Sequence, residues 1–110
     1  MPTKLVIERE GNYTKVSGDA CCGKTWYAKA LAAKAALEGQ AVIVIHTYGE
    51  YDSLDSPHIA TMTEVDDAAL LRSDAQLYIF DNMAELGERA LTVSLLLARQ
   101  GKNVVVVAQK

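Results

Sequence analysis

Residues 18–25 read Gly18-Asp19-Ala20-Cys21-Cys22-Gly23-Lys24-Thr25 and fill every fixed position of the pattern G-x-x-x-x-G-K-[ST]. Glycines permit a tight backbone turn whose N–H groups converge on a phosphate group, and the dipole of a following helix adds its positive end. The pattern predicts that Lys24 brings its charge to the β- and γ-phosphates and that Thr25 offers a hydroxyl group to Mg²⁺. We therefore expect these residues to bind a nucleotide, with Lys24 also acting in catalysis.

The segments that flank the motif supply the strand and the helix that the pattern needs. Tyr13 to Ser17 is short and rich in residues that favour strands, whereas the residues after the motif are rich in Ala and Leu and predict a helix over about 24–37 that ends at Gly39. Trp26 and Tyr27 begin this helix and are interpreted chiefly as packing residues, with stacking on adenine as the alternative. We include Trp26 among the residues expected to contact the nucleotide.

The rest of the chain alternates between apolar, β-branched runs and helical patterns. Strands are predicted at 5–7, 13–17, 41–45, 76–80 and 104–107, helices at about 24–37, 64–71 and 84–99, and a loop at 46–59. The first two strands form an antiparallel hairpin, and the capping-box spacing of Thr63 and Asp66 opens the second helix. Repeated strand–helix alternation predicts an α/β fold with three layers, in which a mainly parallel sheet has an antiparallel amino-terminal edge strand.

Length and composition restrict the class of protein. At 110 residues the chain is expected to be a single domain over 1–110. No apolar run is long enough to cross a membrane and the first residues show no signal-peptide core, so we expect a cytoplasmic protein with no membrane partner. Adjacent Cys21 and Cys22 are expected to be reduced loop thiols, and His46 and His58 lack the spacing of zinc ligands.

The charge balance leaves DNA open as a partner. A net charge of −3 argues against a surface that holds many nucleic-acid phosphates, because such binding depends on Lys and Arg. The 11 basic residues could nevertheless gather on one face. Arg89 and Arg99 are candidates for an arginine finger across a subunit interface, against the plainer interpretation as solvated helix residues.

Polar residues that end apolar strands are further candidates for a nucleotide site. Asp81 follows the apolar run Leu77–Phe80, and a carboxylate there could hold Mg²⁺ opposite Thr25. Gln109 follows the last strand, where an amide could sense the γ-phosphate. Because the carboxyl ends of parallel strands meet at one edge of a sheet, we expect these residues to lie beside the motif.

Hydrolysis also needs a group that orients or deprotonates the attacking water. Asn82 follows Asp81, and its amide cannot accept a proton as a carboxylate can. Glu50, in the loop after the 41–45 strand, is the candidate catalytic base, with Asp52 and Glu85 as alternatives.

With these pieces in order, residues 16–109 resemble the core of RecA-like P-loop ATPases. Residues 18–25 match the Walker A loop of that family, residues 77–86 are similar to its Walker B segment, and residues 104–109 are similar to the strand that ends in its γ-phosphate-sensing glutamine. The resemblance implies a P-loop NTPase fold that binds ATP and Mg²⁺. The family's catalytic glutamate usually falls at the position of Tyr48, so the chain departs from the family there.

The HerA/FtsK group of DNA-pumping ATPases is a near rival, since it shares the character of Gly49-Glu50-Tyr51 but normally has Glu at the position of Asn82. Two functions are therefore open. One is a Mg²⁺-dependent ATPase linked to DNA recombination or DNA movement, working as a homo-oligomer. The other is a non-hydrolysing module that binds ATP or ADP and regulates a protein partner. A nucleotide kinase ranks last, because no arginine-bearing lid follows the third helix.

Overall fold

A computed structural model of the chain describes residues 5–18, 23–46, 51 and 56–108. Its strands are β1 (Leu5–Glu10), β2 (Tyr13–Gly18), β3 (Val42–Ile45), β4 (Ile59–Met62), β5 (Leu77–Asp81) and β6 (Asn103–Val107). Its helices are α1 (Lys24–Leu37), α2 (Asp67–Arg72), α3 (Met83–Leu86) and α4 (Glu88–Arg99). Strands and helices alternate along most of the chain, which confirms the predicted α/β class.

The described strands form one mixed six-stranded sheet in the order β1-β2-β6-β5-β3-β4. β1 pairs antiparallel with β2, and every other neighbouring pair is parallel. This arrangement confirms the mainly parallel sheet and its antiparallel amino-terminal edge strand. β6 lies between β2 and β5, so the strand that leads into the glycine-rich motif and the strand that ends in Asp81 are not direct neighbours.

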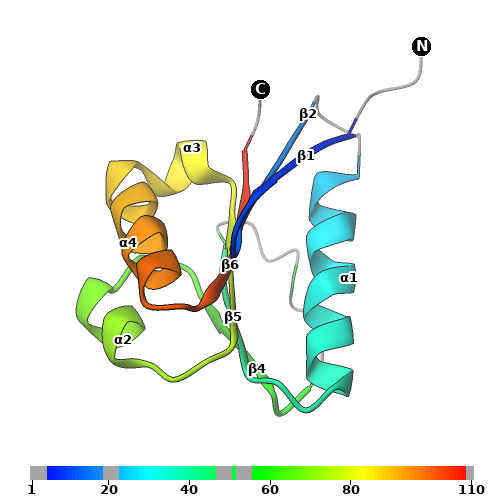
Figure 1. Ribbon diagram of the computed structural model, residues 1–110, viewed down its shortest axis with the longest axis vertical. Coiled ribbons are helices and arrows are strands. Elements are labelled where there is room, and N and C mark those ends of the chain that lie inside the picture. Colours follow the sequence, from blue (N-terminus) through cyan, green and yellow to red (C-terminus); the bar gives the residue numbers. More distant parts are fainter. Residues whose placement is uncertain (1–4, 19–22, 47–50, 52–55, 109–110) are drawn as a thin grey trace.

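Helices cover the sheet on both faces, with α1 on one side and α2, α3 and α4 on the other (Figure 1). The alternation of side chains along each buried strand creates two cores. In β5, Leu77 and Ile79 belong to the core under α1, whereas Tyr78 and Phe80 belong to the core under α4. Among the described residues, no helix has both the length and the apolar character needed to cross a membrane.

Two predicted elements have different bounds in the structure. The predicted helix over 84–99 is split into α3 and α4, because Gly87 between them adopts φ 86° and ψ −175°, outside the helical region. The predicted helix over 64–71 begins later, at Asp67, because Asp66 caps it and Thr63 does not. The Asp66 carboxylate accepts a hydrogen bond from the backbone N–H of Ala69 at 3.1 Å.

β4, which begins at the end of the predicted 46–59 loop, was not predicted from the sequence. β4 pairs parallel with β3 at the edge of the sheet opposite β1. Its central residues, Ala60 and Thr61, are exposed, and its ends, Ile59 and Met62, are only partly buried. A short edge strand of this kind carries too little apolar pattern to be separated from a loop.

Asn12 connects the β1–β2 turn to the end of α4 and the start of β6. Its side-chain amide donates to the carbonyl oxygens of Ala98 at 2.9 Å and Lys102 at 2.6 Å, which belong to the end of α4 and the turn before β6. The backbone carbonyl of Asn12 accepts from the N–H of Val104 at 2.9 Å. One residue therefore fixes the hairpin beside β6.

Asn12→Ala is expected to lower the free energy of unfolding by about 1–3 kcal/mol, since it leaves two part-buried carbonyl groups without their donor. Urea unfolding measures the change. Asn103→Ala is the matched control, because the Asn103 side chain is exposed at the start of β6. Equal effects of the two substitutions would contradict the assigned role of Asn12.

Candidate functional site

The two fixed glycines of the 18–25 motif adopt backbone conformations that suit glycine. Gly18, at the end of β2, has φ 144°, and Gly23, directly before α1, has φ 90°. Other residues are strained at such angles, which explains why glycine occupies both positions. The intervening residues of the motif, Asp19, Ala20, Cys21 and Cys22, lie outside the described part of the chain.

α1 begins directly after Gly23, whose carbonyl oxygen accepts from the N–H of Tyr27 at 2.9 Å. The first turn of α1 contains no acidic residue, and the N-cap makes no side-chain hydrogen bond. The positive end of the helix dipole is therefore offset by no carboxylate from its own first turn. α1 therefore begins within the motif, at Lys24, as the pattern predicts.

Lys24 contacts the first residue of the motif through its side chain. It is only 8% exposed, and its ammonium group donates to the carbonyl oxygen of Gly18 at 2.7 Å. This hydrogen bond spans the segment from the end of β2 to the beginning of α1. It holds the ammonium group of Lys24 against the first residue of the motif.

Thr25 and Asp81 are brought together although 56 positions separate them in the sequence. The Thr25 hydroxyl donates to Asp81 Oδ2 at 3.0 Å. Asp81 ends β5 at only 4% exposure, and by its position in β5 it shares the face of Leu77 and Ile79, which α1 covers. The motif hydroxyl and the strand-end carboxylate therefore lie next to each other, as expected from their positions at one edge of the sheet.

Tyr51 is a further member of the site that the sequence analysis did not identify. It is fully buried, and its hydroxyl donates to the same Asp81 Oδ2 at 2.6 Å. The ring of His46, at the end of β3, lies against it with a centroid separation of 5.5 Å and a tilt of 46°. The sequence feature that could have identified Tyr51 is its position between two acidic residues, in a polar segment that follows a buried strand.

Several other predicted residues do not join this cluster in the described structure. Glu50 and Gln109 lie outside the described residues, so their expected roles stay predictions. Trp26 is 75% exposed, which makes the packing interpretation of its side chain wrong, whereas Tyr27 packs against the core under α1. Arg89 forms an exposed ion pair with Asp67 at 2.8 Å, in keeping with a solvated helix residue.

The oxygen atoms of Thr25 and Asp81 are the kind of ligand that Mg²⁺ prefers. Among the described residues, no three His, Cys, Asp or Glu side chains gather into a metal cluster. The fit to Mg²⁺ therefore depends on one hydroxyl and one carboxylate, a sparse protein contribution that suits a cation held jointly with the phosphates of a ligand.

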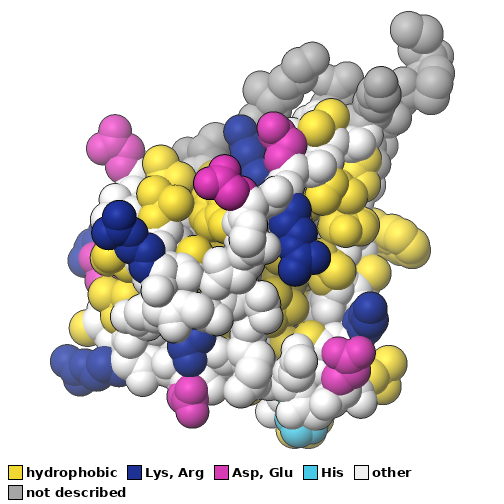
Figure 2. Space-filling view, in the orientation of Figure 1, with side chains coloured by type: hydrophobic (Ala, Val, Ile, Leu, Met, Phe, Trp, Pro, Cys, Tyr) yellow, Lys and Arg dark blue, Asp and Glu magenta, His cyan; other side chains and the backbone are white. Residues whose placement is uncertain are grey.

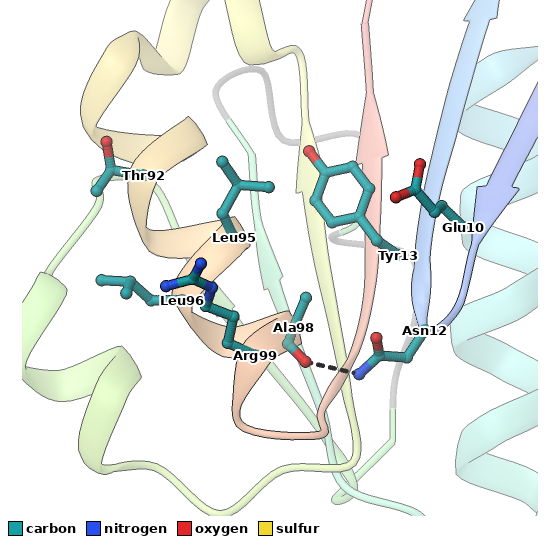
Figure 3. A pocket seen from close by; sticks show the side chains of 8 residues that line it. All are labelled: Glu10, Asn12, Tyr13, Thr92, Leu95, Leu96, Ala98 and Arg99. Atoms are coloured by element: carbon teal, nitrogen blue, oxygen red, sulfur yellow. Dashed lines mark hydrogen bonds between the residues drawn. The ribbon is translucent and has the colours of Figure 1, made fainter.

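A separate groove of about 630 Å³ lies between α4 and the β1–β2 hairpin (Figure 3). Its lining residues are Glu10, Asn12, Tyr13, Thr92, Leu95, Leu96, Ala98 and Arg99. The groove is mainly apolar, and it lies on the face of the sheet opposite to α1. It is therefore distinct from the cluster around Asp81, and of the predicted site residues it contains only the arginine-finger candidate Arg99.

Comparison with protein-family models finds none that matches the chain, and comparison with curated protein sequences finds no significant match. The interpretation of the cluster around Asp81 rests on its residues and its geometry.

Asn82 has a conformational reason to follow Asp81. It is the one non-glycine residue with positive φ among the described residues, at φ 70° and ψ 63°. Asparagine tolerates this left-handed region better than most residues. Its carbonyl oxygen accepts from the N–H groups of Glu85 at 3.0 Å and Leu86 at 3.2 Å, so Asn82 forms the turn that starts α3.

Asn82→Glu is expected to lower the free energy of unfolding by about 1 kcal/mol, because a longer side chain is strained in this region. Asn82→Gly should leave stability nearly unchanged, since glycine adopts the same angles freely. Thermal and urea unfolding of both variants test the assignment. An Asn82→Glu protein as stable as wild type would contradict the claim that the left-handed backbone at position 82 disfavours a longer side chain.

Proposed function

We propose that the chain binds ATP with Mg²⁺ at this edge of the sheet and acts as an ATPase linked to DNA recombination or DNA movement. The observation that carries the proposal is the hydrogen bond of 3.0 Å from Thr25 to Asp81 Oδ2. This contact joins the hydroxyl of the G-x-x-x-x-G-K-[ST] pattern to a strand-end carboxylate. Lys24 and Thr25 are the first two residues of α1, so a cationic side chain and the amino-terminal end of a helix adjoin the hydroxyl that contacts Asp81.

Different described residues would bind the phosphates and the metal ion. Lys24 would exchange its contact with the Gly18 carbonyl for the phosphates and neutralise part of their charge. Thr25 and Asp81 would hold Mg²⁺, which neutralises charge that develops on the phosphate oxygens during transfer. The N–H groups of the first turn of α1 add donors for the phosphate oxygens.

The described residues offer no available carboxylate to activate the attacking water. Asp81 is their only buried acidic side chain, and it already accepts hydrogen bonds from Thr25 and Tyr51. Asn82 is used in a turn, and Glu85 is exposed. The proposed base is therefore Glu50. If Glu50 does not act, the second candidate function applies: a module that binds ATP or ADP without hydrolysis and regulates a protein partner.

In this proposal, DNA is bound by several subunits of an oligomer together, and not by a basic patch on a single subunit. On the face seen in Figure 2, Lys and Arg side chains are interspersed with Asp and Glu and do not form a continuous basic patch. Binding through a few residues from each of several subunits fits such a distribution better than binding by one monomer. The expected sign of DNA involvement is faster ATP hydrolysis at low salt on addition of single-stranded DNA.

Lys24→Ala is expected to weaken the binding of Mg·ATP by about 10- to 100-fold, since it removes a charged hydrogen-bond donor to phosphate. Isothermal titration calorimetry measures the loss. Lys34→Ala is the matched control: it removes the same charge from the same helix about 15 Å away, given a rise of about 1.5 Å per residue. Equal binding by wild type and Lys24→Ala would refute the proposed nucleotide site.

Glu50→Gln separates the two candidate functions. If Glu50 is the base, wild type shows heat of continuing hydrolysis after saturation, and Glu50→Gln saturates with similar affinity but without that heat. Saturation of the wild type without continuing heat would favour the regulatory module. Continuing hydrolysis by Glu50→Gln would remove Glu50 from the mechanism.

A further inference from the structure

Tyr51 is a buried polar side chain that the proposed function leaves without a role. It lies in the core between α1 and the sheet, together with residues such as Val44 and Ala28. A buried tyrosine hydroxyl normally needs a hydrogen-bond partner. Here the partner is Asp81, at 2.6 Å, which is also the proposed metal-binding carboxylate.

Asp81 Oδ2 is held from two directions. Thr25 donates from the first turn of α1 at 3.0 Å, and Tyr51 donates from the segment between β3 and β4 at 2.6 Å. The carboxylate itself belongs to the last residue of β5. Since the two donors come from different elements, together they restrict rotation of the carboxylate more than either donor would alone.

Tyr51 is in turn fixed by its neighbours. The His46 ring lies 5.5 Å from the Tyr51 ring, and the backbone N–H of His46 donates to the carbonyl oxygen of Met62 at 2.9 Å, at the end of β4. Both ring-bearing residues are buried. The Tyr51 hydroxyl is therefore a rigid donor, whose position is set by the sheet and by the core under α1.

We propose that Tyr51 is a positioning residue that orients the Asp81 carboxylate for Mg²⁺ in the nucleotide complex. A metal ligand that is already fixed loses less conformational freedom when the cation binds. Tyr51 makes this contribution through Asp81 and needs no contact with the nucleotide. The inference rests on the proposed function, because it assigns Asp81 to Mg²⁺.

Tyr51→Phe is expected to raise the Mg²⁺ concentration that gives half-maximal ADP binding by about 5- to 30-fold, since one hydrogen bond to the carboxylate is lost. ADP affinity in EDTA should stay within about twofold, because Lys24 and α1 are unchanged. Isothermal titration calorimetry with ADP over a series of Mg²⁺ concentrations gives both values. No hydrolysis is needed for this readout.

Tyr78→Phe is the matched control. Tyr78, in β5, is as fully buried as Tyr51, but its hydroxyl contacts Ser73 and the N–H of Ala75 on the face of the sheet opposite to Asp81. The Tyr78→Phe variant should unfold at a lower urea concentration, but the Mg²⁺ dependence of its ADP binding should be unchanged. In an Asp81→Asn background, Tyr51→Phe should have no further effect on Mg²⁺ dependence, because the two residues act through one contact.

The outcomes separate this inference from the proposed function. If wild type binds ADP in a Mg²⁺-dependent way and Tyr51→Phe behaves like Tyr78→Phe, the role of Tyr51 is overturned and the proposed function stands. If wild type does not bind ADP with Mg²⁺, both are overturned. Should Tyr51→Phe not fold, the hydroxyl proton of Tyr51 in wild type is followed by NMR: a shift when Mg²⁺ is added to the ADP complex supports the role, and an unchanged resonance overturns it.

Discussion

The buried carboxylate at the end of β5 is the constraint around which this edge of the molecule is built. Asp81 is 4% exposed and ends a strand whose other residues are all apolar or aromatic. An isolated carboxylate in such surroundings would cost several kcal/mol. The hydroxyls of Thr25 and Tyr51 provide donors, and each of them fixes a different part of the chain to the sheet. Thr25 at the start of α1 and Tyr51 after β3 are therefore held by the same carboxylate.

Sheet order and helix composition decide whether Thr25 can reach that charge. β6 separates β2 from β5, so the two strand ends are about 10 Å apart at the usual strand spacing of about 4.8 Å. α1 must cross β6 closely to bridge this distance. The residues that it buries against the sheet include Ala28, Ala32 and Ala35, and small side chains allow a close approach. The alanine-rich pattern after the motif thus helps to assemble the site as well as to form a helix.

Local sequence signals predicted most of the fold and part of the site. The apolar runs identified β3, β5 and β6, and the glycine pattern correctly marked the end of β2 and the start of α1. Strand order and the contact between Tyr51 and Asp81 depend on which segments meet in space, and no local pattern encodes that. β4 and the break at Gly87 were missed for a different reason: a half-exposed edge strand and a single glycine are weak signals in one sequence.

The turn after Asp81 restricts which residues can activate the attacking water. The chain leaves the sheet at Asn82 through the left-handed region, which disfavours a long acidic side chain at that position. The next acid along the chain, Glu85, is exposed on α3. Tyr51, by contrast, contacts Asp81 directly, and Glu50 precedes Tyr51 in the sequence. A base that lies next to Tyr51 in the sequence, as we propose for Glu50, therefore does not require a long acidic side chain at a left-handed position.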